Sequence, residues 1–204
     1  SLPEDEYSTK APQGQGYGKK TVLLPETMTH TLISWAEQHK LTPNTLLQGA
    51  WALLLSRYSG EDRVVFGATR TGRHAPLEGA ESMVGLMINT VPFPVHVPAT
   101  SRLLLWLGSL RSEWTAMRDF EHTPLTKIRE WSQISSSEPL FESLLVFENY
   151  QLTASMRAQG EQWKNRQFHL IGTTHYPLTI VGYLGAQLSL EATYDQQRFD
   201  DATI

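Results

Sequence analysis

The sequence contains no cysteine among its 204 residues. Neither a disulfide framework nor thiolate chemistry is therefore available to this chain. It also lacks an apolar run long enough to cross a bilayer, and its acidic start, Glu4-Asp5-Glu6, is unlike a signal peptide. We therefore predict a cytoplasmic protein that does not act at a membrane.

An excess of positive charge is absent too. The formal net charge is -4 and the isoelectric point is near 6.0, which gives no basic surface for nucleic acid. Hydrophobic residues make up 40% of the chain and charged residues 19%, as in globular proteins rather than disordered ones. The sequence therefore predicts one globular domain, or a large piece of one, that does not bind nucleic acid.

The compact signatures of catalysis are missing as well. There is no Gly-x-Ser-x-Gly elbow, no His-Glu-x-x-His motif and no Walker loop. The seven histidines are scattered and have no cysteines or clustered carboxylates beside them, so we expect no metal site. We interpret His122, which precedes Thr123-Pro124, as a residue that orients or caps a helix end. Residue chemistry alone thus predicts no catalytic group.

What the sequence does contain is a charge-free apolar stretch, Val84 to Val95. Its composition predicts a strand covered on both faces, at the core of the fold. Asn89 and Thr90 are adjacent within it, so their side chains should point to opposite faces, and each needs a hydrogen-bond partner if buried. Asn89 then has two interpretations, a strand-end residue that satisfies nearby backbone groups or a residue that lines a binding site.

Three further residues in this stretch indicate a binding surface. Pro92 and Pro94 are two positions apart, so their missing N–H groups lie along one edge, and the second half of the strand should border a gap or leave the sheet. Gly85 would let another backbone or a ligand come close. A buried strand that ends beside a polar pair therefore predicts the wall of a binding tunnel.

The rest of the chain alternates helix and strand signals. Residues 1–20 are rich in Gly, Pro, Gln and charge, and we interpret them as a linker. Helices are expected at 25–39, 42–59, 101–117 and 124–131, the third capped by Thr100 or Ser101, and strands at 63–69, 140–150, 167–173, 177–183 and 188–194. The last two strands should form an antiparallel hairpin that turns at Gly185. A helix-start signal at Phe199-Asp200-Asp201 with no helix after it indicates that the sequence was cut there.

Four stretches together resemble the second half of the condensation domains of nonribosomal peptide synthetases. They are Thr42-Pro-Asn-Thr-Leu-Leu-Gln through Tyr58-Ser-Gly, Val84-Gly-Leu-Met-Ile-Asn-Thr, His122-Thr-Pro-Leu-x-x-Ile-x-x-Trp, and Pro139-Leu-Phe running to Phe147-Glu-Asn-Tyr. The second matches the family's Gly-x-x-x-Asn-Thr strand, and the third is a short form of its His-Gln-Asp-x-Pro pattern. The four stretches occur in the family's order and spacing, and together they extend over most of the chain after Thr21.

The resemblance implies an α/β fold of two layers (α+β), a chloramphenicol-acetyltransferase-like lobe with a mixed sheet and helices packed on one face. Residues 21–204 would be the C-terminal lobe of a condensation domain, and the N-terminal lobe would be absent. The family's His-His-x-x-x-Asp-Gly motif belongs to that first lobe. This sequence has no adjacent histidines and no Asp-Gly. We therefore expect the fragment alone to be inactive.

The resemblance also implies a function and partners. Such domains join a donor acyl thioester to an acceptor aminoacyl thioester as an amide, and both groups arrive on phosphopantetheine carried by carrier proteins, with an adenylation domain nearby and no directly bound cofactor. Gly85, Asn89, Thr90 and Asn149 would then line the substrate tunnel. Two alternatives stay open, namely a non-catalytic recruitment module and an epimerization domain or acyltransferase of the same fold.

Overall fold

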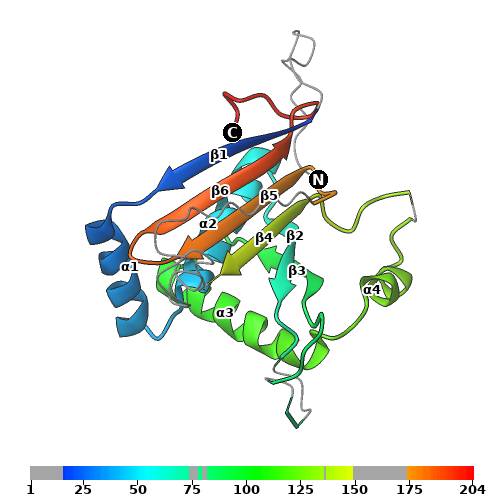
Figure 1. Ribbon diagram of the computed structural model, residues 1–204, viewed down its shortest axis with the longest axis horizontal. Coiled ribbons are helices and arrows are strands. Elements are labelled where there is room, and N and C mark those ends of the chain that lie inside the picture. Colours follow the sequence, from blue (N-terminus) through cyan, green and yellow to red (C-terminus); the bar gives the residue numbers. More distant parts are fainter. Residues whose placement is uncertain (1–15, 74–77, 80–81, 136, 149–173) are drawn as a thin grey trace, which may run out of the picture. The chain divides into compact units, whose positions relative to one another are not determined.

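The computed structural model describes residues 16–73, 78–79, 82–135, 137–148 and 174–204. The described residues divide into two compact units, the first within residues 35–145 and the second within residues 16–34, 146–148 and 174–204, and Figure 1 labels their α-helices and strands. Helix α1 (Glu26–Gln38) and strand β4 (Ser143–Glu148) each cross the boundary between the units.

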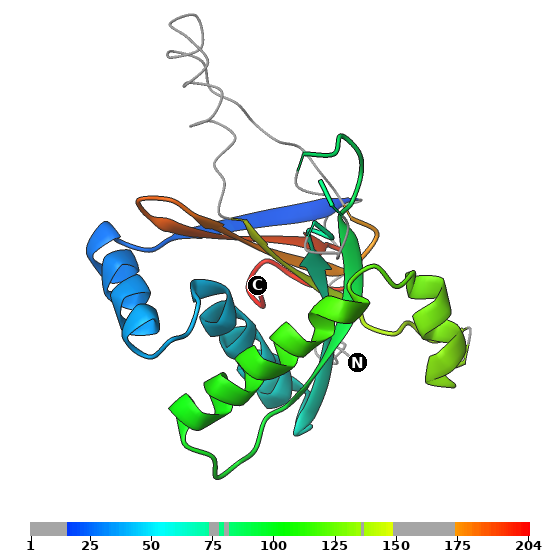
Figure 2. The same ribbon diagram turned by 90° about the horizontal axis from the view of Figure 1, so that it is seen from below.

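The first unit combines sheet and helices. Its elements are α2 (Pro43–Ser59), β2 (Arg63–Arg70), β3 (Asn89–His96), α3 (Leu103–Ala116), the 3₁₀ turn η1 (Met117–Phe120), α4 (Leu125–Ser132) and the first half of β4. Strand β2 runs antiparallel to β3 and parallel to β4, so the predicted mixed sheet is confirmed. Helices α2 and α3 lie on the same side of these strands (Figure 2).

The boundaries of α2 follow from its sequence. Thr42 is the N-cap, and its side-chain oxygen accepts a hydrogen bond from the Thr45 N–H at 3.2 Å. Pro43 fits the first turn, where no N–H donor is needed. The helix ends at Gly60, which adopts a left-handed conformation with φ 74°. The prediction of a capped helix over 42–59 is confirmed at both ends.

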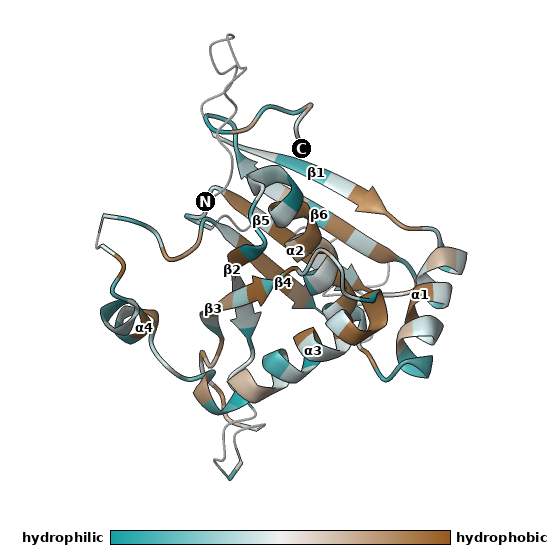
Figure 3. Ribbon diagram, turned by 180° about the vertical axis from the view of Figure 1, so that it is seen from behind, coloured by the Kyte–Doolittle hydropathy of each residue, from teal (hydrophilic) through white to brown (hydrophobic). Residues whose placement is uncertain are grey.

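Aromatic side chains fill the space between β3 and α3. The rings of Phe66 and Phe93 meet edge to face with centroids 5.6 Å apart, and Phe93 meets Trp114 at 5.1 Å. Trp106 is buried as well and donates its indole N–H to the His96 carbonyl at 2.8 Å. Hydrophobic residues also dominate β4, as Figure 3 shows. These contacts fill the helix side of the strands, and the buried Phe141 ring packs on the other side, over Gly67.

The second unit contains β1 (Tyr17–Leu23), β5 (Leu178–Leu184) and β6 (Leu188–Asp195), with antiparallel pairs in the order β1-β6-β5. Strands β5 and β6 form the predicted hairpin, whose turn includes Gly185. Strand β1 begins at Tyr17, so the last four residues assigned to the linker from sequence lie in a strand. The expected strand at 167–173 lies outside the described residues.

Two expectations for the first unit are wrong. The stretch 84–88 is not a buried strand, because Val84 and Leu86 are 104% and 90% exposed and β3 begins only at Asn89. Within β3, burial alternates from Val91 onward, so one face is buried instead of both. Neither Thr100 nor Ser101 caps α3, since its N-cap residue is Arg102 and makes no side-chain capping bond.

The proline argument, in contrast, is confirmed. Among the described strands β3 is hydrogen-bonded to β2 alone and ends the strand order, so it is an edge strand. Pro92 and Pro94 lie in that edge, where a missing N–H costs no ladder hydrogen bond.

Candidate functional site

The start of β3 is tied to the turn before α4 by Asn89. Its side-chain amide donates to the backbone carbonyl oxygens of Glu121 and Thr123, both at 2.9 Å, and its side-chain oxygen accepts from the Thr90 N–H at 3.0 Å. Both amide protons and the oxygen are therefore used within the chain. Asn89 has the strand-end role that the sequence left open, and its contact with a tunnel stays a prediction.

Thr90 faces the other way. Because side chains alternate along a strand, Thr90 and Pro92 point away from the face that holds Phe93 and the helices. Thr69 lies directly opposite Thr90 on β2, and Val65 on the same face is 41% exposed. This surface, formed by Val65, Thr69, Thr90 and Pro92, is called the open face below. It is apolar, and the ring of the buried Phe141 covers its middle at Gly67, which pairs with Pro92. The hydroxyl groups of Thr69 and Thr90 have no hydrogen-bond partner among the described residues.

The other predicted site residues lie elsewhere. Gly85 is exposed, and a Cβ added to it would meet no atom within 4 Å, so the described chain makes no close approach there. Close approaches occur instead at Gly67, where an added Cβ would overlap the Phe141 ring, and at Gly72, beside the backbone of Met87. Asn149 lies outside the described residues.

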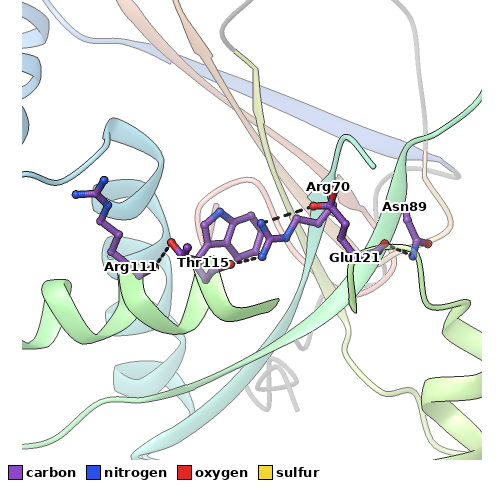
Figure 4. A network of polar contacts seen from close by, with 6 residues as sticks. Arg70, Asn89, Arg111, Thr115 and Glu121 are labelled. Atoms are coloured by element: carbon purple, nitrogen blue, oxygen red, sulfur yellow. Dashed lines mark hydrogen bonds and ion pairs between the residues drawn. The ribbon is translucent and has the colours of Figure 1, made fainter. Parts of the chain in front are cut away.

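A buried charged cluster, which the sequence analysis missed, lies next to Asn89 (Figure 4). Arg70 is the last residue of β2 and is 7% exposed, and Glu121 is 1% exposed. Their side chains form an ion pair, with the Arg70 Nη1 and the Glu121 Oε2 4.0 Å apart. The guanidinium carbon of Arg70 lies 3.5 Å from the centre of the Trp114 ring, and its Nη2 donates to the Trp114 carbonyl. We call Arg70, Trp114 and Glu121 the Arg70 cluster.

The polar atoms of the Arg70 cluster are only partly satisfied. Neither carboxylate oxygen of Glu121 has a hydrogen-bond partner among the described residues, nor does Nε of Arg70. Burial lowers the pKa of Arg70, the charge of Glu121 opposes that shift, and the charge of Arg118 adds to it. A buried charge pair with so few hydrogen bonds contributes little net stability. Net stability therefore does not account for the presence of this pair.

A pattern in the sequence could have indicated this cluster. Val64, Phe66 and Ala68 are the buried residues of β2 on the helix side, and Arg70 continues the same alternation. A charged residue at an inward position of a buried strand requires a partner of opposite charge nearby. Glu121, two residues before the predicted Thr123-Pro124 helix start, is that partner.

Two kinds of feature are absent from the part of the chain that the structure describes. No helix there is both long enough and apolar enough to cross a bilayer. No group of three or more His, Cys, Asp or Glu residues there is arranged to hold a metal ion.

Comparison with known proteins identifies a family. The model of the Condensation domain family matches residues 1–204. A linear gramicidin synthase of Brevibacillus parabrevis is 42% identical over 203 residues, covering 95% of this chain and 4% of that protein. A mycosubtilin synthase of Bacillus subtilis is 32% identical over 197 residues, covering 94% of this chain and 8% of that protein. The chain thus spans a small fraction of the length of these relatives.

Solved structures agree in fold. A four-domain nonribosomal peptide synthetase superposes with a TM-score of 0.75 at 17% identity, covering 98% of this chain and 16% of that one. The starter condensation domain of rhizomide synthetase gives a TM-score of 0.72 at 17% identity, and the match covers all of this chain and 45% of the other. At these identities the likeness shows the fold, and it confirms the α/β class expected from the sequence.

Proposed function

Because the chain belongs to the condensation-domain family, we propose that it forms the C-terminal half of a condensation domain of a nonribosomal peptide synthetase. One observation supports a half of such a domain, and another supports the C-terminal half. The match to the starter condensation domain of rhizomide synthetase takes in all of this chain but only 45% of that one. The four stretches that resemble the family belong to its second half, and no His-His-x-x-x-Asp-Gly motif occurs in the 204 residues.

The proposed reaction is aminolysis of a thioester. The amine of the acceptor attacks the donor's carbonyl carbon, a C–N bond forms, the C–S bond breaks, and the amine's proton ends on the released thiol. Since a thioester is already reactive, holding amine and carbonyl together in a water-free channel can supply about 7–11 kcal/mol in the best intramolecular cases. In this proposal the present chain supplies one wall of that channel, and the other half of the domain supplies the histidine motif.

The open face is the observation that best supports this proposal. Phosphopantetheine is a chain of methylene groups interrupted by two amides, so it needs an apolar surface with a few hydroxyl or backbone partners. Thr69 and Thr90 offer two hydroxyls, unpartnered among the described residues, on facing positions of β2 and β3. Val65 and Pro92 provide apolar surface on the same face. The side chains present therefore fit an arm delivered by carrier proteins, and the adenylation domain would load the carriers.

Activity measurements on loaded carrier proteins test this function. We expect a complete condensation domain that includes this chain to form the amide, and the 204-residue chain alone to form none. Product from the isolated chain at the rate of the complete domain would overturn the proposal. Carrier binding without any product from the complete domain would favour the recruitment module, and product from acyl-CoA in place of an acyl carrier protein would favour an acyltransferase.

Matched variants test the open face. Thr90→Val removes one hydroxyl while keeping the shape of the side chain, and we expect it to lower kcat/KM about 5- to 10-fold, the equivalent of one hydrogen bond of about 1 kcal/mol. Thr126→Val, on exposed surface of α4, is the control and should leave kcat/KM unchanged. Equal rates for both variants would exclude Thr90 from the substrate path.

A further inference from the structure

The Arg70 cluster and Asn89 form one continuous network. Arg70 and Asn89 face each other as the last pair of the β2–β3 ladder. Both hold the same segment, because the side chain of Glu121 pairs with Arg70 while its backbone carbonyl accepts from Asn89. The side chain and the backbone of one residue are thus bound by the facing ends of two strands, as Figure 4 shows.

The geometry limits what Glu121 can do. Its carboxylate is 1% exposed, so it cannot touch a carrier protein or a substrate on the surface. A buried, poorly hydrogen-bonded ion pair contributes little net stability, and apolar side chains of similar size often replace one at no cost. Such a pair can still fix one arrangement of the backbone, because each charge is paired with the opposite charge of the other residue.

We propose that Glu121 is a positioning residue of the condensation reaction: its carboxylate, held by Arg70, orients the carbonyls of residues 121 and 123 that bind Asn89, and so fixes Thr90 on the open face. The chain of contacts is short. Asn89 accepts the Thr90 N–H, so a shift of the carbonyls moves the amide of Asn89 and with it the start of β3. This inference rests on the proposed function, but its structural part can be measured without it.

Hydrogen exchange tests the structural part on the 204-residue chain. Glu121→Gln removes the charge and keeps the shape, and we expect the Thr90 amide to exchange at least tenfold faster. Glu130→Gln is the matched control, because Glu130 pairs with Lys127 on the exposed surface of the same unit. It should change the exchange of Thr90 less than twofold. Exchange of Thr90 within twofold of the wild type in Glu121→Gln would overturn the proposal.

Kinetics of the complete domain test the positioning part. Glu121→Gln should lower kcat at least tenfold and leave KM for the acceptor carrier within twofold, since neither charge of the pair is exposed to a carrier. Asn89→Asp, which removes the two amide donors, should lower kcat by a similar factor. The double variant should lose no more than either single variant, because both act through the same carbonyls. If the two factors by which kcat falls were multiplied in the double variant, the proposal would be overturned.

A double apolar variant separates positioning from stability. Arg70→Met with Glu121→Met removes both charges, keeps a flexible side chain against Trp114, and should unfold within a few degrees of the wild type. If the ion pair served stability alone, the double variant would show slow exchange of the Thr90 amide and full kcat, and that result would overturn the proposal. We expect the exchange to stay fast and kcat to stay low. If the wild-type domain formed no amide, the proposed function would be wrong. The effect of Glu121 on the start of β3 would still be tested by the exchange rate of the Thr90 amide.

Discussion

The phenol ring of Tyr194 lies directly over Gly18, so close that a Cβ added to Gly18 would overlap the ring. The two residues face each other in the pairing of β1 with β6. Tyr194 is also the most deeply buried side chain of its strand, and its hydroxyl donates to Asp201 at 2.5 Å. A side chain at position 18 would therefore have to displace a buried ring whose hydroxyl is bonded to Asp201.

Gly18→Ala should destabilise the protein by about 1–3 kcal/mol, the usual cost of forcing a group into a filled space. Urea unfolding followed by fluorescence measures this change. Gly108→Ala is the control, because a Cβ there meets nothing within 4 Å and the residue lies inside α3. That substitution should stabilise the protein by up to about 1 kcal/mol. Equal effects of the two substitutions would contradict the close packing of Tyr194.

The stability of the protein should fall steeply in strong alkali. Burial, together with the hydrogen bond to Asp201, raises the pKa of Tyr194 to about 12. An unfolded tyrosine ionises near pH 10, so the folded state keeps the neutral phenol. The resulting stability is complete below about pH 10 and is lost as pH rises towards 12. Tyr194→Phe should flatten this alkaline limb in urea titrations, and an unchanged limb in that variant would contradict the role given to Tyr194.

The two possible caps of the long helices should behave differently. Thr42→Ala removes the hydroxyl that accepts the Thr45 N–H and should cost about 1 kcal/mol. Ser101→Ala removes a hydroxyl that makes no capping bond to α3 and should change stability by less than about 0.5 kcal/mol. Thermal unfolding of both variants measures the difference. A larger cost for Ser101→Ala would restore the cap expected from the sequence.

The two faces of the sheet in the first unit should respond unequally to truncation. Phe93→Leu removes two edge-to-face ring contacts, each of which contributes about 0.5–1.5 kcal/mol, so we expect a loss of about 1–3 kcal/mol. Val65→Ala, on the open face, should cost less than about 1 kcal/mol because that side chain is already part-exposed. Similar losses in chemical denaturation would mean that the open face is covered in solution.

Local signals in the sequence located most of the elements. The Thr-Pro start and the Ser-Gly end define α2 because both act within a few residues of the helix end. The turn at Gly185 defines the hairpin for the same reason. The cap of α3 was misplaced because Thr100, Ser101 and Arg102 are consecutive and nothing local chooses between them.

The stretch 84–88 shows that apolar composition alone does not predict burial. Its apolar residues predict a buried strand when considered alone, yet they are exposed in the described chain. An apolar composition indicates that burial of these side chains would be favourable, but it does not indicate which part of the protein or which partner buries them. The Arg70 cluster was missed for a related reason, since the pairing of Arg70 with Glu121 joins residues far apart in the sequence.

The edge strand β3 has a consequence for association between copies of the protein. Val97 donates to the Asp62 carbonyl, so by the alternation of an antiparallel ladder the N–H groups of Thr90, Pro92 and Pro94 would face outward. Two of these donors do not exist, and the third is occupied by Asn89. A strand from a neighbouring copy would find no donors with which to extend the sheet over this span. The edge is therefore protected against the strand-by-strand growth that leads to aggregates.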